Sequence, residues 1–179
     1  MVPTQPNRQP ASPSLLRPTY QNRLRVIGHH LDTEQYREAA IFEIEGGFIV
    51  RATPRHAKRA RALEFPDSQF ENAMHVAINH RGHGPKYDNH SSVLPTGYQD
   101  FLRGLGFLLD NQNTIGITIC ELDSHVLVAG HEPSNSVSGH NAFRAFERYL
   151  TYDDVQRLLD DAFHRRTETS KRGGFLGIF

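Results

Sequence analysis

Two stretches of the chain, 78 residues apart, carry the same pattern of hydrophobic and polar positions. Residues 20–52 align with residues 98–130 without a gap, and ten of the 33 positions are identical. Self-similarity at a fixed spacing predicts an internal duplication. The identical pairs are Tyr20/Tyr98, Gln21/Gln99, Leu24/Leu102, Arg25/Arg103, Gly28/Gly106, Leu31/Leu109, Asp32/Asp110, Ile41/Ile119, Glu43/Glu121 and Val50/Val128.

The spacing of apolar residues predicts the elements of each copy. Tyr20, Leu24, Ile27 and Leu31 recur every three or four residues, which is the stripe of an amphipathic helix. The second copy repeats this stripe over 98–109. Residues 40–45 and 117–122 alternate as strands do, and a second strand follows each of them after a turn, Gly46-Gly47 in the first copy.

A closing helix is predicted at the end of each copy. The first follows Pro66-Asp67-Ser68, and the second follows Thr151, with Asp154 placed as in a capping box. A lone hairpin is marginal in water, so the two hairpins are expected to join. The predicted fold is α+β: two tandem helix–strand–strand–helix units around a pseudo-twofold axis, with a four-stranded antiparallel sheet covered by helices.

The same pattern predicts how the chain is divided. We expect the first unit over 19–81 and the second over 98–166, joined by a linker over 82–97 that is rich in polar residues and glycine. Five of the ten prolines lie within residues 1–18, which predicts a disordered leader. Residues 167–179 are expected to form a flexible tail with an apolar end.

Gly28 and Gly106 occupy the same position on the two helical stripes. Glycine inside a helix costs about 1 kcal/mol relative to alanine. Its presence at both positions indicates either a close approach of backbones or simple inheritance from one ancestral unit.

Composition narrows the classes of function. Lys plus Arg and Asp plus Glu both number 20, so no overall charge attracts the chain to nucleic acid or to an anionic membrane. Cys120 is the only cysteine, which excludes an internal disulfide and a four-cysteine zinc site. No apolar run reaches the roughly 20 residues of a membrane span. We expect a cytoplasmic protein without a cofactor.

Two groups of residues are candidates for chemistry. Glu43 and Glu121 hold equivalent places in the first strand of each copy, and a pair of facing carboxylates at the sheet centre would support acid–base work or bind a cation. The alternative is that each glutamate lies on the polar side of a half-buried sheet. His80, His83 and His90 suggest a metal site, but they also fit a polar linker without metal.

Two further groups are candidates for partner binding. Arg51, Arg55, Lys58, Arg59 and Arg61 form the strongest local positive charge, suited to nucleic-acid phosphates or to a solvated surface. The tail has four apolar residues after a Gly-Gly pair. Exposed apolar residues are unfavourable in water, so they are expected to pack on this chain or on a partner. They are Phe175, Leu176, Ile178 and Phe179.

These observations favour a non-enzymatic binding or adaptor protein that makes protein–protein contacts through its sheet face, its helix faces or its tail. The alternatives are nucleic-acid binding through Arg51–Arg61 and a metal-dependent enzyme at the linker histidines. Self-association is also expected, because free sheet edges can pair between two copies.

Overall fold

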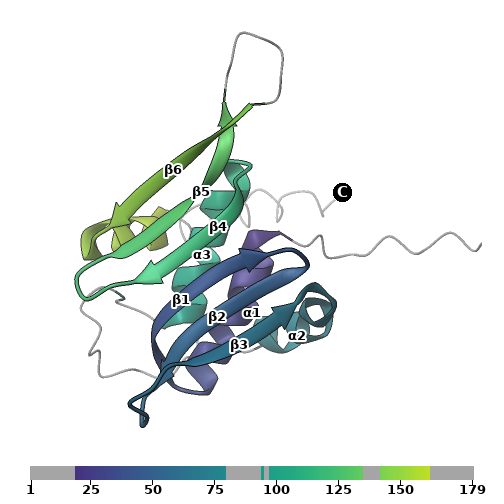
Figure 1. The fold of residues 1–179 in the computed structure, drawn as a ribbon, viewed down its shortest axis with the longest axis vertical. Coiled ribbons are helices and arrows are strands. Elements are labelled where there is room, and N and C mark those ends of the chain that lie inside the picture. The colour runs from purple at the N-terminus through teal and green to yellow at the C-terminus, as the bar shows by residue number, and fades with distance from the viewer. Residues whose placement is uncertain (1–18, 80–93, 95–96, 135–141, 162–179) are drawn as a thin grey trace, which may run out of the picture.

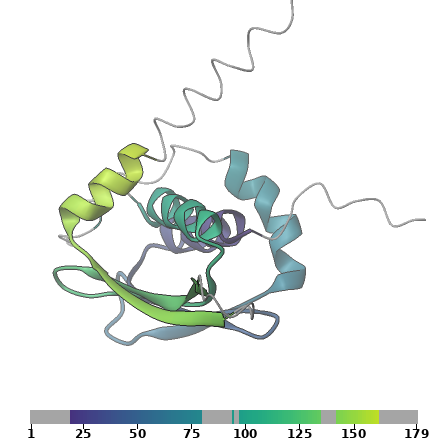
Figure 2. The same cartoon turned by 90° about the horizontal axis from the view of Figure 1, so that it is seen from above.

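The structure is a two-layer α+β fold with four helices on one side of a six-stranded antiparallel sheet. It is a computed structural model that describes residues 19–79, 94, 97–134 and 142–161. In Figure 1 the sheet faces the viewer and the helices lie behind it. Figure 2, seen from above, shows two central helices, α1 (Tyr20–Thr33) and α3 (Tyr98–Asn111), over the middle of the sheet, with one helix on either side of them.

The two halves of the chain have the same order of elements. The first half consists of α1 (Tyr20–Thr33), β1 (Tyr36–Ile44), β2 (Gly47–Pro54), β3 (Arg61–Pro66) and α2 (Asp67–Asn79). The second half consists of α3 (Tyr98–Asn111), β4 (Ile115–Glu121), β5 (Val126–Ser134), β6 (Ala142–Leu150) and a helix over 152–161. The strands lie in the order β3-β2-β1-β4-β5-β6.

The expected four-stranded sheet is wrong, because each half contributes a third strand. β3 pairs with β2 along its whole length, and β6 does the same with β5. Both are edge strands, and each leads into the closing helix of its half. Each half is therefore a helix–strand–strand–strand–helix unit. The α+β class and the antiparallel sheet are confirmed.

The two halves meet in the sheet where β1 pairs with β4. Ile41 lies opposite Ile119, and on either side of this pair Ala40 lies opposite Cys120 and Phe42 opposite Thr118. Ile41 and Ile119 are themselves 78 residues apart. The residues on one side of the central pair are thus the equivalents of those on the other side.

The halves meet a second time where α1 packs against α3. A Cβ atom added to Gly28 would lie 2.6 Å from Cα of Gln99, and one added to Gly106 would lie 2.6 Å from Cα of Gln21. No side chain fits in that space, so the predicted close backbone approach is confirmed. The two contacts are equivalent, because Gly28 and Gly106 are 78 residues apart and so are Gln21 and Gln99.

Side chains from both layers fill the space between helices and sheet. Leu24, Ile27 and Leu31 of α1, and their equivalents on α3, are almost fully buried against the sheet. Ile41, Phe48 and the other residues on the facing side of the strands complete this core. Within the described residues, no helix combines the length and the apolar character that crossing a membrane requires.

Candidate docking surfaces

The side of the sheet that faces away from the helices carries few charges. We call this side the outer sheet face. On the four inner strands, its two central rows contain one charged residue, Arg51, which is exposed on β2. The other members of these rows are Ala40, Phe42, Ile49, Thr118, Cys120, Leu127 and Ala129.

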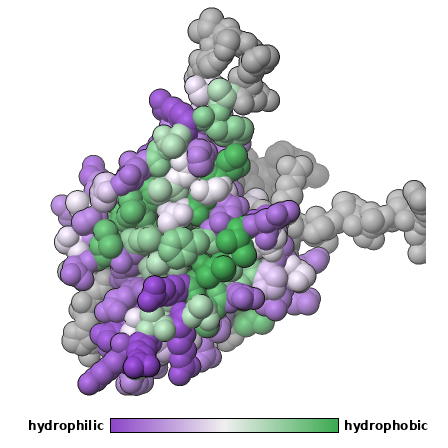
Figure 3. Space-filling model, in the orientation of Figure 1, coloured by the Kyte–Doolittle hydropathy of each residue, from purple (hydrophilic) through white to green (hydrophobic). Residues whose placement is uncertain are grey.

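The other charged groups of these two rows lie on the edge strands. Glu64 of β3 continues the row of Ile49, and Glu147 of β6 continues the row of Ala129. Large hydrophobic side chains are exposed nearer the centre, where Phe42 is 38% exposed, Ile44 46% and Leu122 41%. They are also exposed on the edge strand β6, where Phe143 is 48% and Tyr149 56% exposed. Figure 3 shows hydrophobic residues gathered over the middle of this face, with hydrophilic residues around them.

In β1 the side of the strand that carries the glutamate faces the helices, and the side that carries Phe42 faces solvent. In an ordinary half-buried sheet the charged side would face solvent. Sequence alone suggested that Glu43 and Glu121 would lie on a polar, solvent-facing side. Their side of the strands instead faces the helices, together with the buried Ile41 and Ile119. Phe42 and its neighbours consequently face outward. The sequence signal for this arrangement is weak, because both sides of the strands carry apolar residues.

Glu43 and Glu121 do not face each other. Because β1 and β4 run in opposite directions from the Ile41–Ile119 pair, the two glutamates lie two residues beyond it on opposite sides. Their positions are separated by about 13 Å along the strands, from the usual rise per residue. The structure therefore does not bring them together as a catalytic pair.

Each glutamate accepts the same two hydrogen bonds. The Tyr20 hydroxyl donates to Oε2 of Glu43 (2.6 Å), and the Ile117 backbone N–H donates to the same oxygen (2.9 Å). In the other half, the Tyr98 hydroxyl and the Ala39 backbone N–H donate to Oε2 of Glu121. These four contacts tie each helix to the sheet and each half to the other half.

A bulge in each central strand accounts for the backbone donors. The ladder is irregular between Arg37 and Ala40 in β1, and between Ile115 and Thr118 in β4. Each irregularity includes a residue with positive φ, Glu38 at 53° and Gly116 at 62°. A bulged residue leaves the ladder, and its neighbour's N–H is free to bond the carboxylate. Burial and the neighbouring carboxylates raise the pKa of Tyr20 and of Tyr98 well above the ordinary value of 10.0.

The basic residues Arg51–Arg61 lie at one corner of the sheet, around the turn from β2 to β3. Lys58 and Arg59 are exposed in that turn, and Arg51 and Arg61 are exposed on the two strands. Arg55 is half-buried, and its backbone N–H donates to the Gln35 carbonyl (2.8 Å). The structure thus places Lys58, Arg59 and Arg61 around one turn at an edge of the sheet, whereas Arg51 lies in a central row of the outer sheet face.

Cys120 lies near the middle of the outer sheet face. Its thiol is partly exposed and unpaired, and partial burial raises its pKa. A raised pKa lowers the population of the reactive thiolate. Cys120 therefore behaves as a small apolar member of this face, and it also provides a unique position for chemical labelling.

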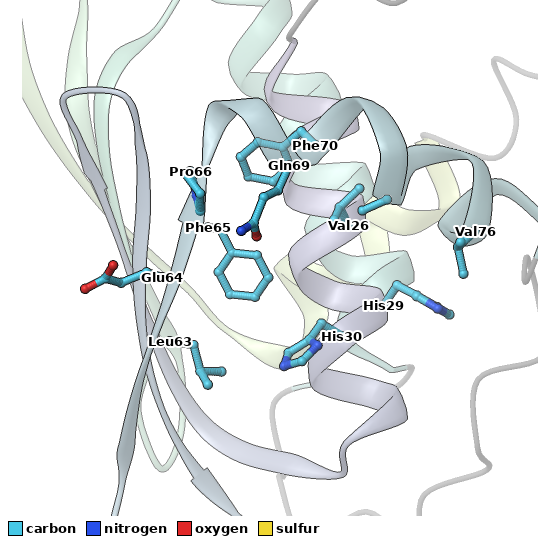
Figure 4. Close-up of a pocket in the computed structure, with 11 residues that line it drawn as sticks. Val26, His29, His30, Leu63, Glu64, Phe65, Pro66, Gln69, Phe70 and Val76 are labelled. Carbon is cyan, nitrogen blue, oxygen red and sulfur yellow. The ribbon is translucent and has the colours of Figure 1, made fainter.

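A groove opens between α1, β3 and α2 in the first half. Its volume is about 400 Å³, and Figure 4 shows Phe65, Leu63 and His30 approaching one another across it. His30 contacts the Phe65 ring edge-on, with centroids 5.4 Å apart, and burial lowers the His30 pKa from 6.5. The sequence pattern does not predict this groove, because it does not predict β3 as a strand.

The second half holds a corresponding groove of about 330 Å³ between α3, β6 and the 152–161 helix. At the spacing of 78 residues, Phe107 and Leu108 take the places of His29 and His30. The two linings therefore differ in chemistry: the first includes His29, His30 and Glu64, and the second includes Asp154, Arg157 and Asp161.

The other predicted sites lie outside the described residues. His80, His83 and His90 belong to that group, as do the leader, most of the linker and the tail residues Phe175, Leu176, Ile178 and Phe179. Among the residues that the structure does describe, no three or more His, Cys, Asp or Glu side chains are grouped to hold a metal ion.

Comparison of the chain with protein-family models, with curated proteins and with solved structures gives no match.

Proposed function

We propose that the chain is a non-enzymatic binding protein, an adaptor, that holds another protein chain against its outer sheet face. The observation that carries this proposal is the distribution of charge on that face. Its centre is apolar except for Arg51, and its glutamates lie on the edge strands. An apolar centre within a polar rim is the usual anatomy of a protein–protein interface. A large exposed apolar patch on a folded domain marks such a site.

Four buried or half-buried carboxylates support a structural role for the interior. Glu43 and Glu121 accept hydrogen bonds from tyrosine hydroxyls and from backbone N–H groups of the other half. Asp32 and Asp110 accept backbone N–H groups at helix starts. These four acids hold helices and strands together, and that role accounts for the positions they occupy.

We also propose that the two halves descend from one duplicated unit and are related by a pseudo-twofold axis. The repeated sequence supports this proposal, and so does the recurrence of the glycine contacts, the bulges and the tyrosine–glutamate pairs at a spacing of 78 residues. An adaptor built this way presents one continuous face made by both copies. The compartment we propose is the cytoplasm, which suits a chain whose one cysteine is unpaired.

The test compares two equally exposed aliphatic residues on different surfaces. Ile44 is 46% exposed on the outer sheet face, and Val76 is 50% exposed on α2, on the opposite layer. The immobilised wild-type chain is expected to retain a partner that Ile44→Lys loses and Val76→Lys keeps. A lysine on the apolar face would have to be desolvated in the complex, which is costly.

Retention of the same proteins by the wild type and by Ile44→Lys would refute the sheet-face proposal. Circular dichroism of both variants, matching the wild type, shows that the comparison is made between folded chains. Leu122→Lys, at the equivalent position of the second half, provides a second test of the same face.

The alternative function, nucleic-acid binding, has one specific observation in its favour. Lys58, Arg59 and Arg61 are all exposed around one turn, where they are accessible to phosphate groups. This alternative predicts that retention on duplex nucleic acid weakens as salt rises and depends on Lys58 and Arg59. It makes no use of Ile44, so the two functions are separable by mutation.

A further inference from the structure

We propose that the protein packed against the outer sheet face is a second copy of this chain, so that two sheets stack with their helical layers outward. This inference rests on the proposed function, because it takes the outer sheet face as the docking surface. It identifies the partner, which the function itself leaves open.

The area of the face matches what a stable pair needs. Six strands spaced by the ordinary 4.8 Å are about 29 Å across, and strands of the lengths found here extend about 26 Å. The projected area is roughly 750 Å². A standard protein–protein interface covers about 800 Å² on each partner. A partner that covers this face completely is therefore about as wide as another sheet of the same size.

The alternation of large and small side chains on the outer sheet face suits packing against another sheet. Phe42 stands beside the smaller Ala40 on β1, and Leu127 stands beside Ala129 on β5. Stacked sheets lie about 10 Å apart and interdigitate their side chains, which requires large residues on one sheet above small residues on the other. A second copy offers the same large and small residues in equal number.

The charges of the face also allow it to pair with itself. The face carries an arginine, Arg51, on β2 and glutamates, Glu64 and Glu147, on the edge strands. In a twofold pair each residue of one copy has a counterpart on the other copy, so Arg51 of either copy can meet an acidic group. A face with charges of one sign could not pair in this way without repulsion.

Sedimentation velocity tests the inference directly. As protein concentration rises through the micromolar range, the wild type is expected to pass from the mass of one chain to twice that mass. Ile44→Lys and Leu122→Lys are each expected to raise the dimer dissociation constant at least about 100-fold, because each places a charge in the apolar interface. Val76→Lys, matched in exposure but on α2, is expected to change the constant less than about threefold.

Cys120 gives an independent measurement on the same samples. It is the only cysteine, and it lies on the outer sheet face next to Ile119, where the two central strands β1 and β4 pair. Its alkylation by iodoacetamide is expected to slow as the dimer forms, and to stay fast at all concentrations in Ile44→Lys. Protection of Cys120 shows that the outer sheet face is covered in the dimer. The mass measured by sedimentation does not identify the covered surface.

Three results overturn the inference, and they separate it from the proposed function. A chain that stays single at all concentrations while its capture of another protein still depends on Ile44 refutes the second copy and keeps the docking face. A chain that stays monomeric, and whose binding of other proteins is unchanged by Ile44→Lys and Leu122→Lys, refutes both the second copy and the docking face. A dimer insensitive to both lysine variants, with Cys120 unprotected, places the contact elsewhere, such as on the edge strands β3 and β6.

Discussion

Asp32 and Asp110 cap each other's helices. Oδ1 and Oδ2 of Asp32, near the end of α1, accept the backbone N–H groups of Tyr98 and Gln99 at the start of α3, both at 2.9 Å. Asp110, near the end of α3, accepts those of Tyr20 and Gln21 at the start of α1, at 2.8 and 2.9 Å. Each carboxylate thus accepts hydrogen bonds from two backbone N–H groups that have no carbonyl partner within their own helix.

Removing these caps is expected to weaken the fold unequally. Asp32 is 3% exposed, whereas Asp110 is half-buried, so Asp32→Ala leaves its donors more completely cut off from water. Asp32→Ala should lower the free energy of unfolding by about 2–3 kcal/mol and Asp110→Ala by about 1 kcal/mol. Urea unfolding measures both. The exposed Glu34→Ala is the control, and equal losses in all three variants would show that the capping bonds have no special weight.

The glycines at the α1–α3 contact are expected to reverse the usual effect of a helical Gly→Ala change. Alanine normally stabilises a helix by about 1 kcal/mol relative to glycine. At Gly28 the new methyl group would meet backbone atoms of α3 at 2.6–2.7 Å, and the helices would have to separate. We expect Gly28→Ala and Gly106→Ala each to lower the melting temperature, with a loss of at least about 2 kcal/mol. The exposed Thr33→Ala on α1 should change little; a stabilised Gly28→Ala would contradict the close approach.

Stability is expected to fall above pH 10 because of the buried tyrosines. The folded-state pKa of Tyr98 is raised, chiefly by burial and by the charge of Glu121. Below pH 10 both the folded and the unfolded chain keep the proton, so this contribution to stability is complete. Above pH 10 the unfolded chain releases it and the folded chain does not, which lowers the unfolding free energy by about 1.4 kcal/mol per pH unit. Tyr20 acts in the same direction.

Chemical unfolding between pH 9 and pH 11 measures this slope, within the range set by the ordinary tyrosine pKa. Tyr98→Phe should be less stable than the wild type at neutral pH, because Glu121 loses a donor, and should show a shallower decline above pH 10. An unchanged decline in Tyr98→Phe would mean that other groups cause the alkaline loss.

Reversing the charge of the basic turn distinguishes the two candidate functions. Lys58 and Arg59 are exposed and lie at the corner of the sheet, away from Ile44. The double variant Lys58→Glu, Arg59→Glu is expected to leave self-association and protein capture within about twofold of the wild type, as surface charge changes usually do. Loss of salt-sensitive retention on duplex nucleic acid in this variant, with the wild type retained, would support the nucleic-acid alternative instead.

The spacing of apolar residues correctly predicted the helices, which are held by hydrogen bonds between residues close in sequence. The stripe Tyr20, Leu24, Ile27, Leu31 predicted α1, and its repeat predicted α3. The helix after Thr151 was also predicted, and there Asp154 and Thr151 exchange the expected capping bonds. Helices form bonds between near neighbours in sequence, so their signal is local.

The edge strands were missed because their signal is not local. In β6, Phe143, Phe146 and Leu150 are spaced by three and four residues, which resembles a helix as much as a strand. The segment is a strand because it pairs with β5 along its length. Without β3 and β6, the two grooves that these strands border could not be predicted either.

By itself, the amino-acid sequence determined the α+β class, the two central helices, the hairpins and the repetition at 78 residues, because each follows from the spacing of side chains along one segment. Only the tertiary structure decided that β1 and β4 pair about Ile41 and Ile119, and which side of these strands the helices cover. Both sides carry apolar residues, and the tyrosine and backbone donors that make Glu43 and Glu121 stable inside come from distant parts of the chain. That choice is what leaves Phe42 and Ile44 exposed on the outer sheet face.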